Sequence, residues 1–401
     1  MRPLSVSAGR PKVVILRGQL VNPWELRPWE RLADRFDVSV LVPHRHPQAL
    51  GDLGISRVRV RTLSDLVPTR RASQLAAPLP VNRYLGLQRQ LHDAAIVHGA
   101  ELHPWFTAQA AGLRPRGGFR LVSTVWETIP FRSALRHPLS RRNRKAVLAA
   151  TDLFLAATER ARTALLLEGV AAHRVRVAEP GVDLSRFATA KAGPMHDDDP
   201  LVISPGRLVW EKGHQDVLRA VAALRGGVVE GPRSARRIRA LILGSGPEER
   251  TLRSYAADLG VSDAVEFCPS VPYEEMPEVY ARASAMVLAS LPIQSWEEQF
   301  GMVLAEAMAA GVPIVTTSSG AIPEVVGPEA VQVAPGDWVG IAQALADGPL
   351  VEPGRRVVYQ PERLERFGTE AAAERIAGAY EHVLAAGNPA PNSAGGAGKA
   401  L

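Results

Sequence analysis

Residues 298–327 read EQFGMVLAEAMAAGVPIVTTSSGAIPEVVG, and their pattern predicts a helix followed by a strand. Residues 302–310 consist of strong helix formers and carry Glu306 as their single charge. Residues 313–316 are apolar or β-branched and lie between Gly311 and a Ser-Ser-Gly turn, which favours a short strand. A buried helix that leads directly into a buried strand is typical of a parallel α/β sheet.

Short apolar strands alternate with helical segments on both sides of this stretch. Such alternation predicts βαβ units and therefore parallel sheets. In the first half of the chain we expect strands at residues 12–16, 38–42, 57–61, 96–98, 121–125, 153–156 and 175–178. In the second half we expect them at 201–204, 239–243, 265–267, 285–288 and 313–316. A helix is expected around residues 26–35.

The alternation is interrupted once, at residues 190–200 (AKAGPMHDDDP), whose Gly, Pro and Asp content is typical of a linker. We therefore expect an N-terminal Rossmann-like domain at 1–187, a linker at 188–200 and a C-terminal Rossmann-like domain at 201–369. An amphipathic helix at 370–386 is expected to pack back on the first domain. Residues 387–401 are poor in apolar side chains and are expected to be a disordered tail.

Composition excludes several classes of protein. Of the 401 residues 46% are hydrophobic and 22% charged, and the formal net charge is +6, so the chain is neither mainly disordered nor collagen-like. Cys268 is the single cysteine, which excludes an intrachain disulfide and a cysteine-based zinc cluster. Because we find no secretory signal and no apolar run of about 18 residues, we expect a soluble cytoplasmic protein. We expect no nucleic-acid partner.

Residues 205–214 (PGRLVWEKGH) follow a strand and open a helix. Gly206 allows a tight turn, while Arg207 and Lys212 place two cations where open α/β sheets bind ligands, which favours a phosphate site. Two surface cations beside a helix start are the alternative. A second strand-to-glycine junction contains Gly244 in LILGSGP, but it lacks the full dinucleotide-binding spacing.

Two carboxylates, Glu298 and Glu306, are separated by seven residues. An ionised carboxylate in an apolar helix is costly to bury, so Glu306 must meet a polar group. Sugar or ribose hydroxyls would suit the two carboxylates, and the backbone amides near residues 301–303 would suit a diphosphate. The alternative is a buried Glu306 that pairs with Arg207 or Lys212.

Three segments, PGRLVWEKG, ILGSGP and EQFGMVLAEAMAAGVPIVTTSSGAIPEVVG, resemble the retaining glycosyltransferases of family 4, which have the GT-B fold. The resemblance implies two Rossmann-like α/β/α domains that face each other across a cleft. It further implies that Arg207 and Lys212 hold the nucleotide diphosphate, that Glu298 meets the donor sugar and that Glu306 binds the ribose. Substrate contacts are also expected at Gly206, Gly244, Phe300, Gly301, Met302 and Val303.

The N-terminal half departs from the family pattern. Instead of a glycine-rich loop after the first strand, only Gly18 is present, and we expect it to contact substrate. In place of the usual cleft histidine the chain has Trp126-Glu127. Glu127 either binds an acceptor hydroxyl or caps a helix. His98 follows another strand and is a second candidate for the cleft, with a structural role as the alternative.

Two further patterns can be interpreted either as solvated surface or as functional sites. Asp197-Asp198-Asp199 contains the D-x-D spacing of a metal-bound sugar nucleotide, but its place in the linker favours a solvated acidic turn. Residues 132–145 (RSALRHPLSRRNRK) hold six basic residues and no acid. They form either a solvated face or a peripheral contact with anionic lipid at the inner membrane face.

The sequence as a whole predicts a retaining glycosyltransferase. It would move a hexose-type sugar from a nucleotide-diphosphate donor to an acceptor hydroxyl, without a metal or another cofactor. The acceptor could be a glycan, a lipid or a small molecule. The alternatives are a sugar-nucleotide epimerase with the same fold and a non-catalytic protein that binds nucleotide or membrane.

Overall fold

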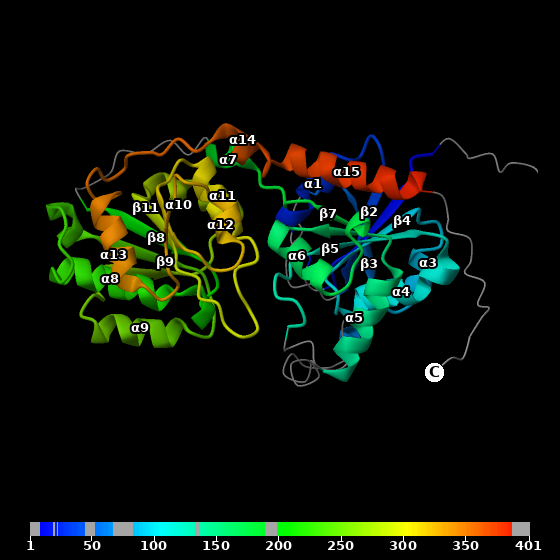
Figure 1. Ribbon diagram of the computed structural model, residues 1–401, viewed down its shortest axis with the longest axis horizontal. Coiled ribbons are helices and arrows are strands. Elements are labelled where there is room, and N and C mark those ends of the chain that lie inside the picture. The colour runs from blue at the N-terminus through cyan, green and yellow to red at the C-terminus, as the bar shows by residue number, and fades with distance from the viewer. Residues whose placement is uncertain are drawn as a thin grey trace, which may run out of the picture.

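The computed structural model describes residues 9–18, 21, 23–44, 53–66, 83–132, 137–188 and 199–386. Within them the chain forms two parallel β-sheets, each covered by helices, which lie side by side along the long axis of the molecule (Figure 1). The sheets have seven and six strands, so the expected pair of Rossmann-like domains is confirmed.

The N-terminal sheet has the order β3-β2-β1-β4-β5-β6-β7. Its strands are β1 (Lys12–Leu16), β2 (Asp37–Pro43), β3 (Ser56–Val60), β4 (Ile96–Ala100), β5 (Arg120–Val125), β6 (Leu153–Ala156) and β7 (Val175–Val177). The helices of this half are α1 (Arg27–Glu30), α3 (Leu87–Gln90), α4 (Trp105–Gly117), α5 (Pro138–Ala150), α6 (Glu159–Leu167) and α7 (Leu184–Ala188). The central strands are buried on both faces, as parallel strands covered by helices require.

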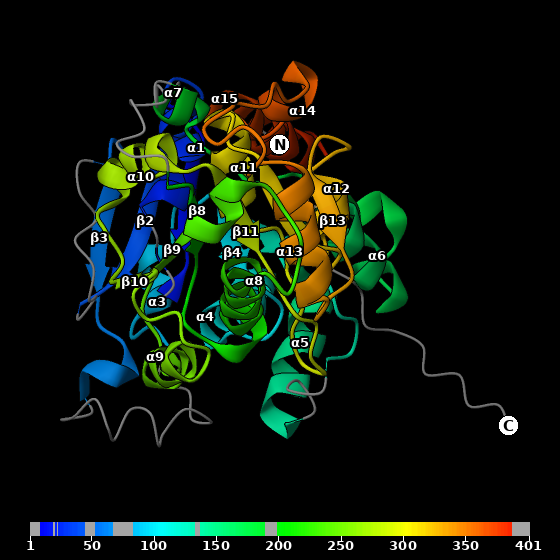
Figure 2. The same ribbon diagram turned by 90° about the vertical axis from the view of Figure 1, so that its left-hand side faces the viewer.

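The C-terminal sheet has the order β10-β9-β8-β11-β12-β13, which is the same doubly wound arrangement. Its strands are β8 (Leu201–Pro205), β9 (Arg239–Leu243), β10 (Val265–Cys268), β11 (Ala285–Leu288), β12 (Ile314–Thr317) and β13 (Val331–Val333). The helices are α8 (His214–Gly226), α9 (Glu249–Asp258), α10 (Met276–Arg282), α11 (Met302–Ala309), α12 (Ile322–Val325), α13 (Trp338–Asp347) and α14 (Pro361–Glu365). Side chains of α8, α9 and α13 cover one face of the sheet, and those of α10, α11 and α12 cover the other (Figure 2).

The helix expected around residues 26–35 is much shorter than the sequence indicates. Only Arg27–Glu30 is α-helical, and a 3₁₀ turn at Trp24–Leu26 precedes it. Beyond α1 the amides of Leu32 and Arg35 bond three residues back, which winds the chain into successive turns instead of a helix.

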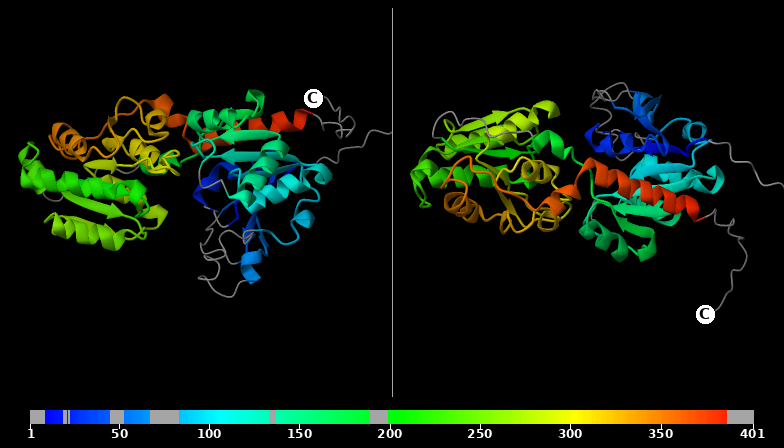
Figure 3. Two further views of the ribbon diagram at one scale, coloured as in Figure 1. Left: turned by 60° about the horizontal axis from the view of Figure 1, so that its bottom comes forward. Right: turned by 90° about the horizontal axis from the view of Figure 1, so that it is seen from above.

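The last helix, α15 (Thr369–Ala385), returns from the C-terminal half and packs across the N-terminal domain (Figures 1 and 3). Its Tyr380 is fully buried. The Tyr380 hydroxyl accepts a bond from Trp29 Nε1 at 2.8 Å and lies 2.6 Å from His98 Nδ1. His98 Nε2 lies in turn 2.7 Å from Thr124 Oγ1. This chain of hydrogen bonds ties α15 to β4 and β5.

The described residues contain no helix whose length and apolar character would let it cross a lipid bilayer.

We expect Tyr380→Phe to lower the free energy of unfolding by about 1–3 kcal/mol, because it leaves buried polar groups of Trp29 and His98 without a partner. Urea unfolding of the full chain measures this. Glu381→Gln on the same helix is the matched control. It removes one exposed ion pair with Arg35 and should change stability by less than about 0.5 kcal/mol. Equal stability of Tyr380→Phe and the wild type would contradict the role of this network.

Candidate active site

The carboxyl ends of strands from both sheets meet at the boundary between the domains. Trp126 follows β5 of the N-terminal sheet, and Phe300 precedes α11 of the C-terminal domain. Their rings touch edge to face, with centroids 6.2 Å apart. The ends of parallel strands are where open α/β sheets bind ligands, so this boundary is the candidate active site.

Lys212 and Glu298 form the ionic centre of the C-terminal side. Lys212 Nζ lies 2.6 Å from Glu298 Oε2, and Ser290 Oγ donates to the same oxygen at 2.7 Å. Glu298 is only 5% exposed, and the Lys212 ammonium lies 4.9 Å from the centroid of the Trp296 ring. The structure thus brings together two of the residues expected from the sequence. Arg207, five residues before Lys212 in the chain, is exposed.

Two glycines allow the loops around this ion pair to approach each other. Gly213 has φ +70°, and a Cβ there would lie 1.8 Å from the carbonyl oxygen of Ala289. Gly320 has φ +58°, and a Cβ there would lie 2.1 Å from the carbonyl oxygen of Glu298. Any other residue would be both strained and in collision with backbone, so the position of Glu298 depends on these glycines.

The start of α11 has the features of an anion site. Gly301 precedes the helix with φ +81°, and no side chain caps it. The amides at this end therefore lack intrahelical acceptors and carry the positive end of the helix dipole. Met302 and Val303, the first two residues of the helix, are half-buried. The ring of Phe300 is buried against Trp126 and Phe367 and is part of the core. Its expected contact with substrate stays a prediction.

The amides of two other glycines expected to bind substrate are already in use. Gly206 N donates to the carbonyl oxygen of Leu243, and Gly244 N donates to that of Cys268, each at 2.9 Å. These bonds hold the loops after β8 and β9 in place. A phosphate would therefore not be bound by the amides of Gly206 and Gly244.

Glu306 meets two tyrosines. Tyr273 donates to its Oε1 at 3.0 Å and Tyr280 donates to its Oε2 at 2.8 Å. Burial raises the pKa of the Glu306 carboxyl, and the two hydroxyls act in the opposite direction. The alternative pairing of Glu306 with Arg207 or Lys212 is wrong, because the aromatic hydroxyls of α10 and the turn before it occupy those positions. Ribose binding by Glu306 stays a prediction.

Two residues of the N-terminal domain that were expected to contact substrate, Gly18 and His98, have protein partners in the structure. Gly18 is buried, and its amide donates to the Tyr84 hydroxyl at 3.0 Å. His98 is fully buried with both ring nitrogens bonded, to Tyr380 and Thr124. Desolvation holds the pKa of His98 well below its ordinary value, so the ring is neutral and structural.

Glu127 lies at the domain boundary and is 8% exposed. Its Oε2 lies 2.7 Å from Arg132 Nη1, and its Oε1 accepts a bond from the amide of Ile129 at 3.0 Å. The bond to Ile129 holds a turn, since the next helix, α5, begins only at Pro138. Glu127 therefore does not cap a helix, and the acceptor role stays a prediction.

Glu101 is a site residue that sequence reasoning missed. It follows β4 with φ +59°, an unusual conformation for a residue with a side chain. Its Oε1 accepts a bond from the amide of Trp126 at 2.9 Å. Burial, more than the neighbouring Glu127, raises the pKa of Glu101 to about 7. The sequence did contain a signal for this residue, namely an acidic residue directly after a buried strand.

A second missed group joins the domains. Arg160 at the start of α6 pairs with Glu297, with Nη2 2.8 Å from Oε2. The carboxylate of Glu324 accepts bonds from the amides of Glu159 and Arg160, at 2.9 and 3.2 Å. Because Glu297 adjoins Glu298, this contact places the loop that contains Glu297 and Glu298 against the N-terminal domain.

The chain is similar to known proteins over most of its length. A family model described as Glycosyltransferase Family 4 matches residues 29–186, and one described as Glycosyl transferases group 1 matches residues 186–348. A D-inositol 3-phosphate glycosyltransferase from Saccharomonospora viridis is 30% identical, over 71% of this chain and 70% of the relative. The chain belongs to glycosyltransferase family 4. It is a glycosyltransferase with the GT-B fold.

Other relatives of this glycosyltransferase agree. D-inositol 3-phosphate glycosyltransferase 1 from Catenulispora acidiphila is 28% identical over 81% of both chains. A GDP-mannose-dependent mannosyltransferase from Mycolicibacterium smegmatis, named for phosphatidylinositol monomannoside, is 38% identical over 37% of this chain and 39% of the relative. The crystal structure of Anabaena HepE with UDP and glucose superposes with a TM-score of 0.68 at 18% identity, over 93% of this chain and 100% of that chain. That likeness shows the fold.

We expect Glu101→Gln to change stability in a pH-dependent way. The Glu101 carboxyl ionises near 4.5 in the unfolded chain and near 7 in the folded one. The folded state therefore holds a proton that the unfolded state releases, and wild-type stability falls as the pH rises through this interval. The variant should match the wild type near pH 4.5 and exceed it by about 3 kcal/mol at pH 8, measured by urea unfolding. A difference that does not vary with pH would contradict the raised pKa.

Proposed function

We propose that the protein transfers a hexose-type sugar from a nucleotide-diphosphate donor to an acceptor hydroxyl with retention of anomeric configuration and without a metal ion. The main support for this proposal is the buried cluster of Lys212, Glu298 and Ser290. It belongs to the same domain as the start of α11, which no side chain caps. The relatives' names support the donor class, since one is GDP-mannose-dependent and one solved structure holds UDP and glucose.

The chemistry follows from where negative charge develops. As the sugar–phosphate bond breaks, charge accumulates on the departing diphosphate. Arg207, Lys212 and the amides at the start of α11 would stabilise that charge, which is the part that a metal would otherwise play. The donor phosphate itself would take the proton of the acceptor hydroxyl. Asp197 and Asp198 of the D-x-D lie outside the described residues, and Asp199 pairs with Arg237.

Lys212 must change partner for this to happen. Without donor its ammonium neutralises Glu298, and with donor the diphosphate competes for it. Glu298 would then keep the bond from Ser290 and turn its remaining lone pairs to the sugar hydroxyls. Binding would thus exchange one ion pair for another and leave neither charge buried alone.

We expect Lys212→Gln to lower kcat by about 10²–10³-fold, the scale for the loss of one group that stabilises transition-state charge. Chelation with EDTA should leave wild-type turnover unchanged. Release of nucleotide from a panel of nucleotide sugars measures both, and NMR of the product's anomeric proton reports retention. Arg250→Gln, an exposed change on the same domain, is the control. Loss of activity on chelation with recovery on adding Mg²⁺ would overturn the metal-free mechanism.

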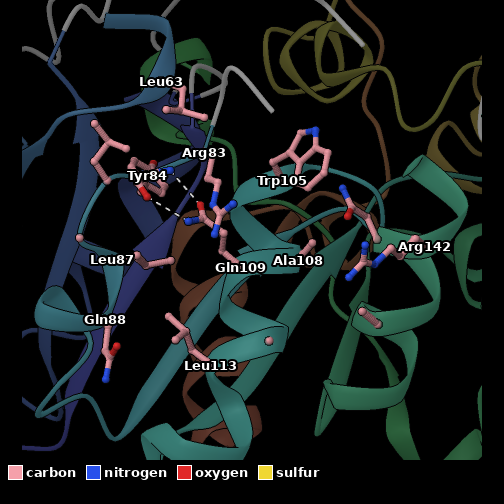
Figure 4. Close-up of a pocket in the computed structure, with 15 residues that line it drawn as sticks. Leu63, Arg83, Tyr84, Leu87, Gln88, Trp105, Ala108, Gln109, Leu113 and Arg142 are labelled. Carbon is pink, nitrogen blue, oxygen red and sulfur yellow. Dashed lines mark hydrogen bonds between the residues drawn. The ribbon is translucent and has the colours of Figure 1, made fainter. Parts of the chain in front are cut away.

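The same proposal includes a peripheral contact with an anionic membrane. On α5 the side chains of Arg141, Arg142 and Lys145 are exposed, whereas Arg144 is held by Glu168. Arg142 also lines a surface pocket of about 840 Å³, together with Trp105 and several leucines between α3, α4 and α5 (Figure 4). Basic side chains beside apolar ones suit a surface of anionic headgroups.

The protein should therefore co-sediment with vesicles that contain phosphatidylglycerol and should not co-sediment with neutral phosphatidylcholine vesicles. The Arg141→Gln/Lys145→Gln variant should bind about thirtyfold more weakly, because each basic residue near the surface contributes about 1 kcal/mol. Added salt should weaken binding by screening. Arg250→Gln/Arg282→Gln on the other domain has the same net charge and serves as control. Binding that is indifferent to lipid charge would favour a solvated face.

A further inference from the structure

Two carboxyl groups project from adjacent strands at the edge of the N-terminal sheet that faces the donor domain. Glu101 follows β4 and Glu127 follows β5, and the two strands pair in parallel register with Ala100 beside Thr124. The amide of Glu101 donates to the carbonyl oxygen of Thr124, and its carboxylate accepts from the amide of Trp126. Glu101 thus bonds to the backbone of the segment that immediately precedes Glu127.

This carboxyl pair lies on the side of the N-terminal domain that meets the loop containing Glu297 and Glu298. Trp126, which lies next to Glu127 in the chain, contacts Phe300 of the C-terminal domain. Burial is the main cause that raises the pKa of Glu127, and the nearby carboxylate of Glu297, which immediately precedes Glu298, adds to it. We therefore expect an acceptor that approaches a sugar held at Glu298 to meet these two carboxyl groups.

The cations near the pair are already engaged. Arg132 is bonded to Glu127 at 2.7 Å. Arg17 is 5% exposed, donates to the carbonyl oxygen of Gly99 at 3.1 Å and lies over the ring of Trp29. Among the described residues no partner bonds to Oε2 of Glu101, whose side chain is partly exposed. The carboxylate oxygen that this edge leaves for a ligand is therefore Oε2 of Glu101, because both oxygens of Glu127 are bonded. Nη1 of Arg132 is held by Glu127, and its Nε is buried without a hydrogen-bond partner.

We propose that Glu101 and Glu127 select an uncharged polyhydroxylated acceptor and reject one that carries a phosphate beside the reacting hydroxyl. This inference rests on the proposed transfer function. Carboxylates accept bonds from hydroxyls, whereas a phosphate dianion has no proton to donate and meets like charge. A phosphate that captured Arg132 would leave Glu127 buried and unpaired, which is strongly unfavourable. The chain thus differs in acceptor class from the relatives that are named for inositol 3-phosphate.

Calorimetry with inositol 3-phosphate and myo-inositol as probes, at pH 8 with nucleotide diphosphate present, tests the proposal. The wild type should bind the phosphorylated probe at least tenfold more weakly than Glu101→Gln/Glu127→Gln does. Glu101→Gln alone, which keeps the Glu127–Arg132 pair, should show part of the gain if the double variant does not fold. Asp34→Asn/Glu381→Gln removes the same charge from exposed sites of this domain and should bind as the wild type does.

Acceptor competition completes the experiment. Where both probes are glycosylated, kcat/KM of the wild type should be at least tenfold higher for myo-inositol, and the double variant should reduce that ratio. Binding of the phosphorylated probe by the wild type as tightly as by the double variant would overturn the inference. Failure of the transfer function is recognised separately, because no nucleotide sugar would then be turned over, even slowly by water.

Discussion

Parallel strands that are buried on both faces leave mainly their ends for charged side chains, and the rest of this structure depends on that constraint. In both sheets the central strands are buried and mostly apolar, with polar exceptions such as His98 in β4 and Ser204 in β8. Charged side chains therefore gather where strands end: Glu101 after β4, Glu127 after β5 and Arg207 after β8. Because two such edges meet, the charged side chains at the boundary come from both domains.

At the half-buried boundary three pairs of opposite charges form between protein side chains. Lys212 pairs with Glu298, Arg132 with Glu127 and Arg160 with Glu297. An unpaired charge in such surroundings is costly, which explains why these pairs form in the absence of a ligand. A bound ligand must then offer each displaced group an equivalent partner. This requirement is a source of selectivity, because a ligand with the wrong charge cannot compensate the group that it displaces.

Much of the fold could be predicted from local pattern. The expected strands at 12–16, 153–156, 239–243 and 285–288 have the bounds that the structure shows for β1, β6, β9 and β11. Short apolar runs between turn residues leave little choice of conformation. The segment around residues 26–35 did not follow its pattern, because a local preference for helix is weak and the turns after α1 satisfy the same amides.

The sequence by itself determined the two-domain alternation, the place of Glu298 before an apolar helix, and the presence of Lys212 in a loop after a strand. Only the tertiary structure decided which partner each polar group takes. His98 is bonded to Tyr380, 282 residues further on, and Glu306 to Tyr273 and Tyr280 instead of a cation. The physical reason is that burial obliges a polar side chain to find a partner but does not specify which one. Packing of distant helices brings one candidate within hydrogen-bond distance, and no local pattern encodes that choice.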